Sequence, residues 1–254
     1  TLVIHATSDV ILDDICTYLA AVRNGFSSDI LQDYCEIPVI FLSTIISELK
    51  LISERGTLDP DQVRLFLESP RGESLSLLVN RWLNDDHLNE MSLIPEIIIE
   101  GILDRNHRKA RQFLLDQISL IPNNQWWHID SFIAYIYQIN PDFQRPAGNY
   151  DTWYIKNAET GNYLRGFEHW DAIDGTFLRF MITGPLFWLG LVDLASSSNE
   201  CGIQAFKFSA WCEDLLSSHP PENIQAEDIK IIIDSYGKII LPLRFSRTLD
   251  RKSV

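Results

Sequence analysis

The sequence predicts a mainly α-helical protein with small β-hairpins and a β element at its C-terminal end. Three observations support this class. Apolar residues recur at intervals of three and four along the first part of the chain, which is typical of amphipathic helices. After Pro141 the composition changes to proline, glycine and aromatic residues, followed by short β-prone segments. Two segments with alternating apolar residues flank a polar loop near residue 200, which indicates a hairpin.

Short helical patterns occupy the N-terminal half, and we predict that the first 120 residues form helices. Asp59-Pro60 supplies a helix cap followed by proline at the first helical position, and Ser69-Pro70 ends that helix. Most of these helices have only about 10–15 residues, so they need tertiary packing to be stable. We expect helices at residues 8–22, 37–52, 73–83, 106–118 and 129–139, within a helical region that covers residues 1–140.

The order of elements after residue 141 predicts a winged-helix domain over residues 141–218. A β-prone segment at 152–155 and its return at 163–164 precede a helix at 171–182, a tight turn at Gly184-Pro185 and a short helix at 185–189. Strands at 191–194 and 203–208 then flank a polar loop, and Ser209 caps a last helix. In a winged helix, one helix can enter the major groove while the hairpin tip reaches the DNA backbone. We expect a second such subdomain within residues 1–140, which gives tandem winged-helix-like subdomains.

Residues 219–254 predict the start of a further β-containing module. An acidic spacer follows Pro220-Pro221, and Tyr236-Gly237 separates two β-prone segments at 229–234 and 238–241. A hairpin that pairs only with itself is marginally stable. We therefore expect either that the chain is a piece of a longer protein or that a partner sheet lies elsewhere. The chain ends in a basic tail with Arg244, Arg247, Arg251 and Lys252.

Composition limits the function without naming it. The chain has 254 residues, a formal net charge of −14 and a pI near 4.7, which excludes a broadly cationic surface but not a local basic patch. No apolar run reaches the ~18–20 residues of a membrane span, and no signal peptide pattern opens the sequence. The spacing of the four cysteines matches no common zinc pattern. We expect a cytoplasmic protein with reduced thiols and no membrane partner.

Several sequence segments between residues 141 and 245 resemble those of a known protein family. They are "PDFQRP", "YDTWYIKNAETGNYLRGFEHWDAIDGTFLRFMITGPLFWLGLVDL", "FKFSAWCEDLL" and the tail "IIIDSYGKIILP". This half of the chain resembles winged-helix-containing bacterial proteins with an XPB-type helicase N-terminal region. The resemblance implies a winged-helix fold, DNA-processing assemblies and a helicase or ATPase as protein partner, but it supplies no catalytic residues.

Two features of the sequence differ from those expected of a helicase that binds DNA through its wing. No GxxxxGK[ST] phosphate loop occurs, so any motor would lie in another chain or in a missing portion. The predicted wing, "ASSSNECG", contains no lysine or arginine, although a wing that contacts phosphates is normally basic.

Two groups of basic residues are candidate DNA contacts. The first is a dense cluster at the start of the helix at 106–118, where Arg108 and Arg111 share one face and Arg105 and Lys109 another; the alternative is a solvated helix face. The second interleaves positive charge with Trp153, Tyr154, Tyr163 and Trp170, as a base-stacking surface requires; the alternative is a hairpin core with arginine stems lying over it. The candidate contacts are Arg105, Arg108, Lys109, Arg111, Arg145, Lys156, Arg165 and Arg179.

Two further groups of residues are candidate sites. Consecutive Trp126 and Trp127 cannot both face one side of a core, so we expect a protein-partner contact there. Glu168, His169, Asp171 and Asp174 form the densest group of acidic residues and histidine. No second histidine stands at ligand spacing, and carboxylates near a helix N-terminus are favoured by the helix dipole, so we interpret this group as helix capping.

No motif of nucleophilic or zinc-dependent hydrolysis occurs, so we predict no catalytic residue, no cofactor and no metal. The expected function is a non-enzymatic DNA-binding or docking module of a helicase-related DNA-processing system. The alternative is a protein–protein interaction scaffold that uses winged-helix folds without touching nucleic acid.

Overall fold

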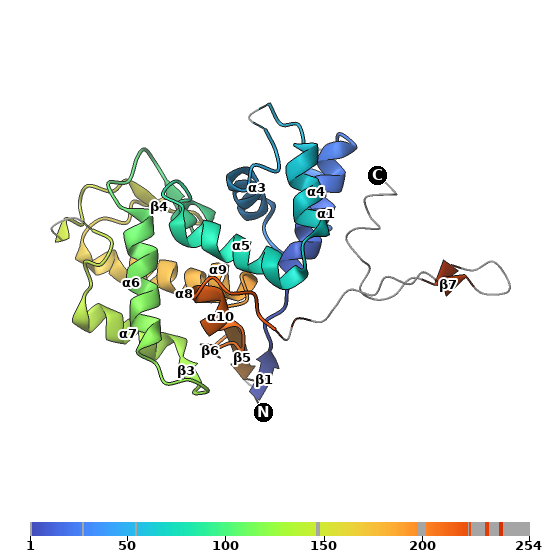
Figure 1. The fold of residues 1–254 in the computed structure, drawn as a ribbon. Coiled ribbons are helices and arrows are strands. Elements are labelled where there is room, and N and C mark those ends of the chain that lie inside the picture. Colours follow the sequence, from blue (N-terminus) through green and yellow to red (C-terminus); the bar gives the residue numbers. More distant parts are fainter. Residues whose placement is uncertain are drawn as a thin grey trace. The chain divides into compact units, whose positions relative to one another are not determined.

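The computed structural model describes residues 2–26, 28–53, 55–145, 148–197, 202–222 and 224, together with 232–233 and 239–240 (Figure 1). Helices account for 49% of the structure and strands for 11%, which confirms the mainly α-helical class. The chain divides into two compact units. Unit 1 contains Thr1–Ser8 and Trp82–Glu213, and unit 2 contains Asp9–Arg81 and Asp214–Val254.

Unit 2 is built from short helices. The Asp59 carboxylate accepts the backbone N–H groups of Asp61 and Gln62 at 3.1 Å each, with Pro60 at the first helical position, as the sequence predicts. Ser69 then adopts an extended conformation and ends this helix. The helices are α1 (Val10–Arg23), α2 (Ser28–Leu31), α3 (Val39–Glu48), α4 (Pro60–Glu68) and α5 (Arg71–Asn84), whose C-terminal end belongs to unit 1.

The core of unit 2 lies between α1 and α3. Ile11 and Ile15 on α1 and Phe41 and Ile45 on α3 are all buried, at the 3-4 spacing that predicts the helices. Arg71, at the start of α5, is buried as well. Its Nε atom lies 2.6 Å from an Asp9 carboxylate oxygen, so a buried ion pair holds the start of α5 to the start of α1.

Unit 1 contains a four-stranded antiparallel sheet in the order β1-β5-β6-β3. Leu194 lies opposite Phe206 and both side chains are buried, so one face of the sheet forms core. The β5–β6 hairpin is the predicted pair of strands around a polar loop, of which residues 198–201 lie outside the described residues. The strands are β1 (Leu2–His5), β3 (Trp127–His128), β5 (Val192–Ser197) and β6 (Ala205–Phe208).

The helices of unit 1 bury apolar faces near this sheet. The Phe132 ring on α7 lies 5.5 Å from the Phe206 ring, edge to face, which packs α7 against β6. The predicted helix at 171–182 begins with a π-helical turn before it becomes α8. The elements are α6 (His107–Ser119), α7 (Ile129–Ile139), the 3-10 turn η3 (Phe167–His169), the π-turn η4 (Asp171–Gly175), α8 (Thr176–Thr183) and α9 (Pro185–Trp188).

Gly184 makes the tight turn between α8 and α9. A Cβ atom added there would lie 2.7 Å from the Phe180 carbonyl oxygen, so glycine is the residue that fits. The Ser209 hydroxyl accepts the backbone N–H of Trp211 at 3.1 Å, just before α10 (Cys212–Leu216), which supports the predicted cap. From α6 onward the chain order is α6, β3, α7, β4 (Ile155–Asn157), η3, η4, α8, α9, β5 and β6, and β3 pairs with β6 in the four-stranded sheet.

A second antiparallel sheet in unit 1 pairs β2 (Ile97–Ile99), which follows the short 3-10 helix η1 (Glu90–Leu93), with β4 (Ile155–Asn157). Tyr163 forms a bridge with Lys156, so the predicted return of the chain at 163–164 occurs. The expectation that the first 120 residues form helices is wrong at β1 and β2. Ile97–Ile99 is a run of β-branched residues without helical periodicity, which favours a strand.

The domain limits drawn from the sequence stay predictions. Unit 1 contains both sides of the segment 141–150, so compactness alone does not divide the chain there. In the tail, β7 (Ile232–Ile233) pairs with β8 (Ile239–Ile240), at the two predicted strand positions. The remainder of the predicted module and the basic tail, with Arg244, Arg247, Arg251 and Lys252, lie outside the described residues.

Candidate nucleic-acid interface

The β2–β4 sheet presents an exposed aromatic face. Side chains alternate between the two faces of a strand. Ile155 and Leu164 are buried, whereas Tyr154 is 50% exposed and Tyr163 45% exposed. Ile98, opposite Lys156 in the register, is also exposed. We call this face the β2–β4 platform and define it by Ile98, Glu100, Tyr154, Lys156, Tyr163 and Arg165.

Arg165 is layered against the two tyrosine rings of the platform. Its guanidinium carbon lies 4.5 Å from the centre of the Tyr154 ring and 5.3 Å from that of Tyr163. The rings themselves meet edge to face, with centres 6.3 Å apart. Arg165 is exposed, so the platform combines a positive charge with flat stacking surfaces at the solvent boundary. Such a surface can stack nucleobases and contact phosphate.

Glu100 holds the edge of the platform together. It accepts hydrogen bonds from the Lys156 ammonium at 2.5 Å and from the Tyr163 hydroxyl at 2.6 Å. These hydrogen bonds, the one from Lys156 above all, lower the pKa of Glu100, and the bond to Glu100 raises the pKa of Lys156. Lys156 therefore stays charged, but its charge is paired with that of Glu100. Arg165 is then the main cation of the platform that is available to a ligand.

Arg145 lies in the core of unit 1 and not on its surface. Its guanidinium donates two hydrogen bonds to one Asp174 oxygen, at 3.1 and 2.8 Å, and Gln144 donates to the other oxygen at 2.7 Å. The guanidinium also stacks on Trp153, 4.0 Å from the ring centre. Burial raises the pKa of Asp174, and the bonds from Arg145 and Gln144 oppose that shift. Asp174 is thus a buried partner of Arg145 and not a helix cap.

Arg179 is half-exposed on α8 and forms an ion pair with Asp130 at the start of α7. Trp153 and Trp170, expected beside it on an aromatic surface, are both buried. The second predicted group is therefore split: Lys156, Arg165, Tyr154 and Tyr163 come together on the platform, whereas Arg145 belongs to the core and Arg179 to the α7–α8 contact.

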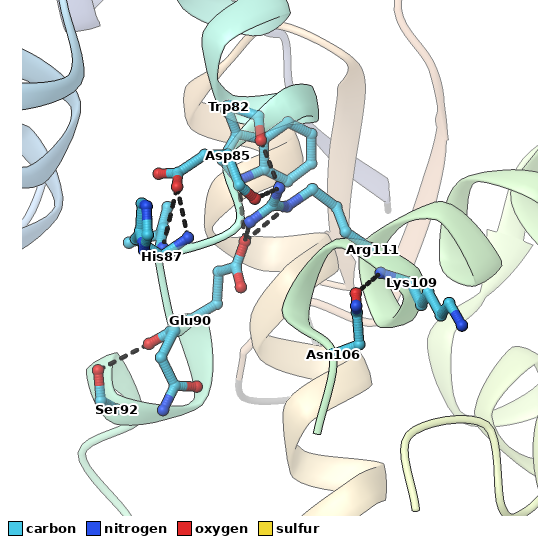
Figure 2. A network of polar contacts seen from close by, with 10 residues as sticks. Trp82, Asp85, His87, Glu90, Ser92, Asn106, Lys109 and Arg111 are labelled. Atoms are coloured by element: carbon cyan, nitrogen blue, oxygen red, sulfur yellow. Dashed lines mark hydrogen bonds and ion pairs between the residues drawn. The ribbon is translucent and has the colours of Figure 1, made fainter. Parts of the chain in front are cut away.

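The first predicted group is also split, because Arg111 points inward from α6. Figure 2 shows its guanidinium between the Trp82 carbonyl and the Glu90 carboxylate. The Arg111 Nε–H donates to Glu90 at 2.8 Å, and an Nη1–H donates to the Asp85 carbonyl at 2.9 Å. Glu90 also accepts the indole N–H of Trp82 at 3.0 Å. Arg111 and Glu90 are essentially inaccessible to solvent, so this pair is structural.

Arg105 has an enclosed guanidinium although part of the residue is exposed. Its guanidinium carbon lies 4.7 Å from the centre of the Phe177 ring, and its three nitrogens have no hydrogen-bond partner among the described residues. Burial lowers the pKa of Arg105 to about 10. Burial also lowers the pKa of His107 to about 4, and the charges of Arg105 and Arg111 act in the same direction.

Arg108 and Lys109 are the members of this group whose charges face solvent. Arg108 donates to the Asn84 side-chain oxygen at 2.9 Å, and the Lys109 backbone N–H is capped by the Asn106 side chain at 2.7 Å (Figure 2). Both side chains are exposed. They remain candidates for a phosphate contact at the start of α6.

Trp126 and Trp127 are both half-buried. Trp127 is paired with Phe206 in the sheet, and the Lys207 ammonium lies 5.2 Å from the centre of the Trp126 ring. The predicted partner contact at these residues stays a prediction.

The described residues contain no group of three or more His, Cys, Asp or Glu side chains arranged to hold a metal ion. Within the same part of the chain, no helix is long and apolar enough to cross a membrane. Glu168 and Asp171 are exposed ahead of α8, apart from the buried Asp174.

Comparisons with family models, with curated proteins and with solved structures give no match to this chain. Sequence reasoning missed Glu90 and Glu100, which have no distinguishing pattern around them and gain their roles from partners distant in sequence, Arg111 and Lys156.

Proposed function

We propose that the chain is a non-enzymatic winged-helix module of a DNA-processing system, and that it binds DNA through the β2–β4 platform. The observation that carries this proposal is the layered arrangement of Arg165 against two exposed tyrosine rings. Exposed aromatic rings and guanidinium planes stack on unpaired bases, each base contributing about 1–3 kcal/mol. The platform therefore favours single-stranded over double-stranded DNA.

The order of elements in unit 1 supports the winged-helix part of the proposal. Leaving aside β4, which pairs with β2 in a separate sheet, the elements from α6 onward are α6, β3, α7, α8 with α9, β5 and β6, and β3 pairs with β6. This order is typical of winged-helix domains, which build on the helix-turn-helix. It would begin at α6, so the domain would start earlier than residue 141. A tandem second subdomain in unit 2 stays a prediction.

The proposal does not use the major-groove mode of the helix-turn-helix. Arg179, the one basic residue of α8, forms an ion pair with Asp130, and exposed Glu168 and Asp171 precede this helix. The described ends of the wing, Ser196, Ser197 and Gly202, carry no positive charge. Repulsion between these carboxylates and phosphates would oppose insertion of α8 into a groove.

Fluorescence anisotropy with a labelled 20-nucleotide single strand and the matched duplex tests the proposal. The wild-type protein should bind the single strand more tightly and lose affinity between 50 and 200 mM salt, because phosphate contacts release counterions. Arg165→Ala should weaken binding at least fivefold, whereas Arg179→Ala, which removes a half-exposed arginine that is paired with Asp130 and is not part of the platform, should leave it within twofold. No binding at 50 mM salt, or equal losses in the two variants, would contradict the proposal.

A second function, docking to a protein partner, is favoured by the acidic surface ahead of α8. The family resemblance at residues 141–245 points to a helicase or ATPase as that partner. Glu168→Lys combined with Asp171→Lys should abolish co-purification with an XPB-type ATPase and leave binding of single-stranded DNA unchanged. If the ATPase binds both forms equally, this surface is not the docking site.

A further inference from the structure

Unit 2 contains a half-open cavity of about 590 Å³ between α1 and α4. This volume lies within the range of about 300–1,000 Å³ that small-molecule sites occupy. All of its lining belongs to unit 2, whereas the β2–β4 platform belongs to unit 1, so the two sites share no residue. The lining comes from the second half of α1, from α4 and from Leu58.

The floor of the cavity is apolar because two helix faces meet there. On α1, Cys16, Leu19 and Ala20 recur at helical spacing, and on α4 Val63 and Leu67 do the same. Leu19 and Leu67 are nearly inaccessible to solvent and close the bottom. Ala20 contributes only a methyl group to this lining. An apolar body can therefore bury its surface in this cavity.

The rim of the cavity carries more positive than negative charge. Two arginines, Arg23 and Arg64, line the cavity together with one carboxylate, that of Asp61. The Arg64 Nε–H is shared between the two Glu68 carboxylate oxygens, at 3.1 and 3.2 Å, and the two side chains are 59% and 39% exposed. A surface pair of this kind is weak, so a ligand carboxylate can compete with Glu68 for Arg64. A guanidinium prefers a carboxylate partner, with which it forms two parallel hydrogen bonds. In a chain with a net charge of −14, this local excess of arginine is complementary to an anionic group.

We propose that the cavity between α1 and α4 binds a free amphipathic monocarboxylate, with its apolar chain against Leu19, Val63 and Leu67 and its carboxylate between Arg23 and Arg64. The dimensions of the floor fit a linear chain. Each lining segment spans residues i to i+7, and seven steps of about 1.5 Å give about 10.5 Å, the length of a medium-chain acid.

Decanoate, decanol and decyltrimethylammonium, each below its aggregation concentration, share one apolar chain and differ in head-group charge. Binding is measured by isothermal titration calorimetry and by NMR shift changes of the α1 and α4 amides. The structure predicts that decanoate binds at least fivefold more tightly than decanol, and decyltrimethylammonium more weakly than both. Equal affinity of the three probes, or shift changes confined to other helices, overturns the proposal.

Variants separate the apolar and the charged parts of the site. Ala20→Trp fills the cavity and should weaken all three probes at least tenfold; Val63→Trp serves the same purpose should the first variant fail to fold. Arg23→Gln with Arg64→Gln should bring decanoate down to the affinity of decanol. Arg81→Gln, at an exposed position of α5 outside the lining, is the matched control and should change nothing. Full decanoate affinity in the filled variants overturns the proposal.

Discussion

The Tyr163 hydroxyl donates a 2.6 Å hydrogen bond to Glu100, which fixes the ring whose face lies beside the Arg165 guanidinium. The bond and the stack use different parts of the same side chain. The ring can be removed, or the hydroxyl alone, and the two changes have different consequences for the proposed DNA contact.

Tyr163→Ala removes the ring and should cost about 1–3 kcal/mol of binding free energy for single-stranded DNA, the contribution of one stacked base. Tyr163→Phe keeps the ring and loses only the bond to Glu100, so its affinity should stay within a few-fold of the wild type. Anisotropy titrations at fixed salt compare the two. Similar losses in Phe and Ala variants would show that the hydroxyl, and not stacking, makes the contact.

Arg111→Ala should lower the free energy of unfolding of unit 1 by about 3–5 kcal/mol, because it leaves the Glu90 carboxylate buried without its cation. Arg108→Ala, three residues away on the exposed side of α6, should stay within about 0.5 kcal/mol. Urea unfolding followed by circular dichroism gives both values. A stable Arg111→Ala protein that has lost DNA binding would instead make Arg111 a DNA contact.

The contrast between these two arginines shows what the sequence could predict. Apolar spacing and an Asn106 cap are local signals, so they predict a helix at 106–118, and the structure has this helix at His107–Ser119. The density of basic residues groups Arg111 with Arg108 as a candidate DNA contact, although the spacing from Arg111 to buried Leu115 and Ile118 is that of one helix face and is a local signal for the inner side. Nothing local indicates that Glu90 would meet it there.

In the platform and the sheets, too, local patterns predict neighbours within a segment but not contacts between distant segments. Alternation within a short hairpin is a local pattern, so it predicts Tyr154 and Tyr163 beside Lys156 and Arg165. Proximity in sequence groups Arg145 with them, yet its guanidinium lies in the core and bonds Asp174, 29 residues away. Pairing of β1 with β5 joins residues nearly 200 positions apart, which no periodicity within either segment encodes.

Replacing the buried pair Arg145–Asp174 tests whether it stabilises the fold or only avoids an unpaired charge. Arg145→Met and Asp174→Leu alone should each destabilise unit 1 by about 3–5 kcal/mol, because each leaves one buried charge uncompensated. The double variant should recover most of that loss. A double-mutant cycle from urea unfolding measures the coupling. Additive losses would mean that the two side chains act independently, against the geometry.

His107 should make the stability of unit 1 depend on pH between about 6.5 and 4. Burial and the charges of Arg105 and Arg111, opposed by Asp85, lower its pKa to about 4 in the folded protein, whereas in the unfolded chain it is about 6.5. Within this range the unfolded state binds a proton that the folded state does not. The free energy of unfolding should therefore fall as the pH decreases through this window and be unaffected by His107 above it. Since the side chain is half-exposed, the loss should be smaller than about 1.4 kcal/mol per pH unit.

Urea unfolding midpoints measured at pH 7, 6 and 5 test this dependence. In His107→Gln the midpoint should fall less between pH 7 and pH 5 than it does in the wild type. His87→Gln, at an exposed position, is the control that should keep the wild-type slope, and an unchanged slope in His107→Gln would assign the pH dependence to other groups.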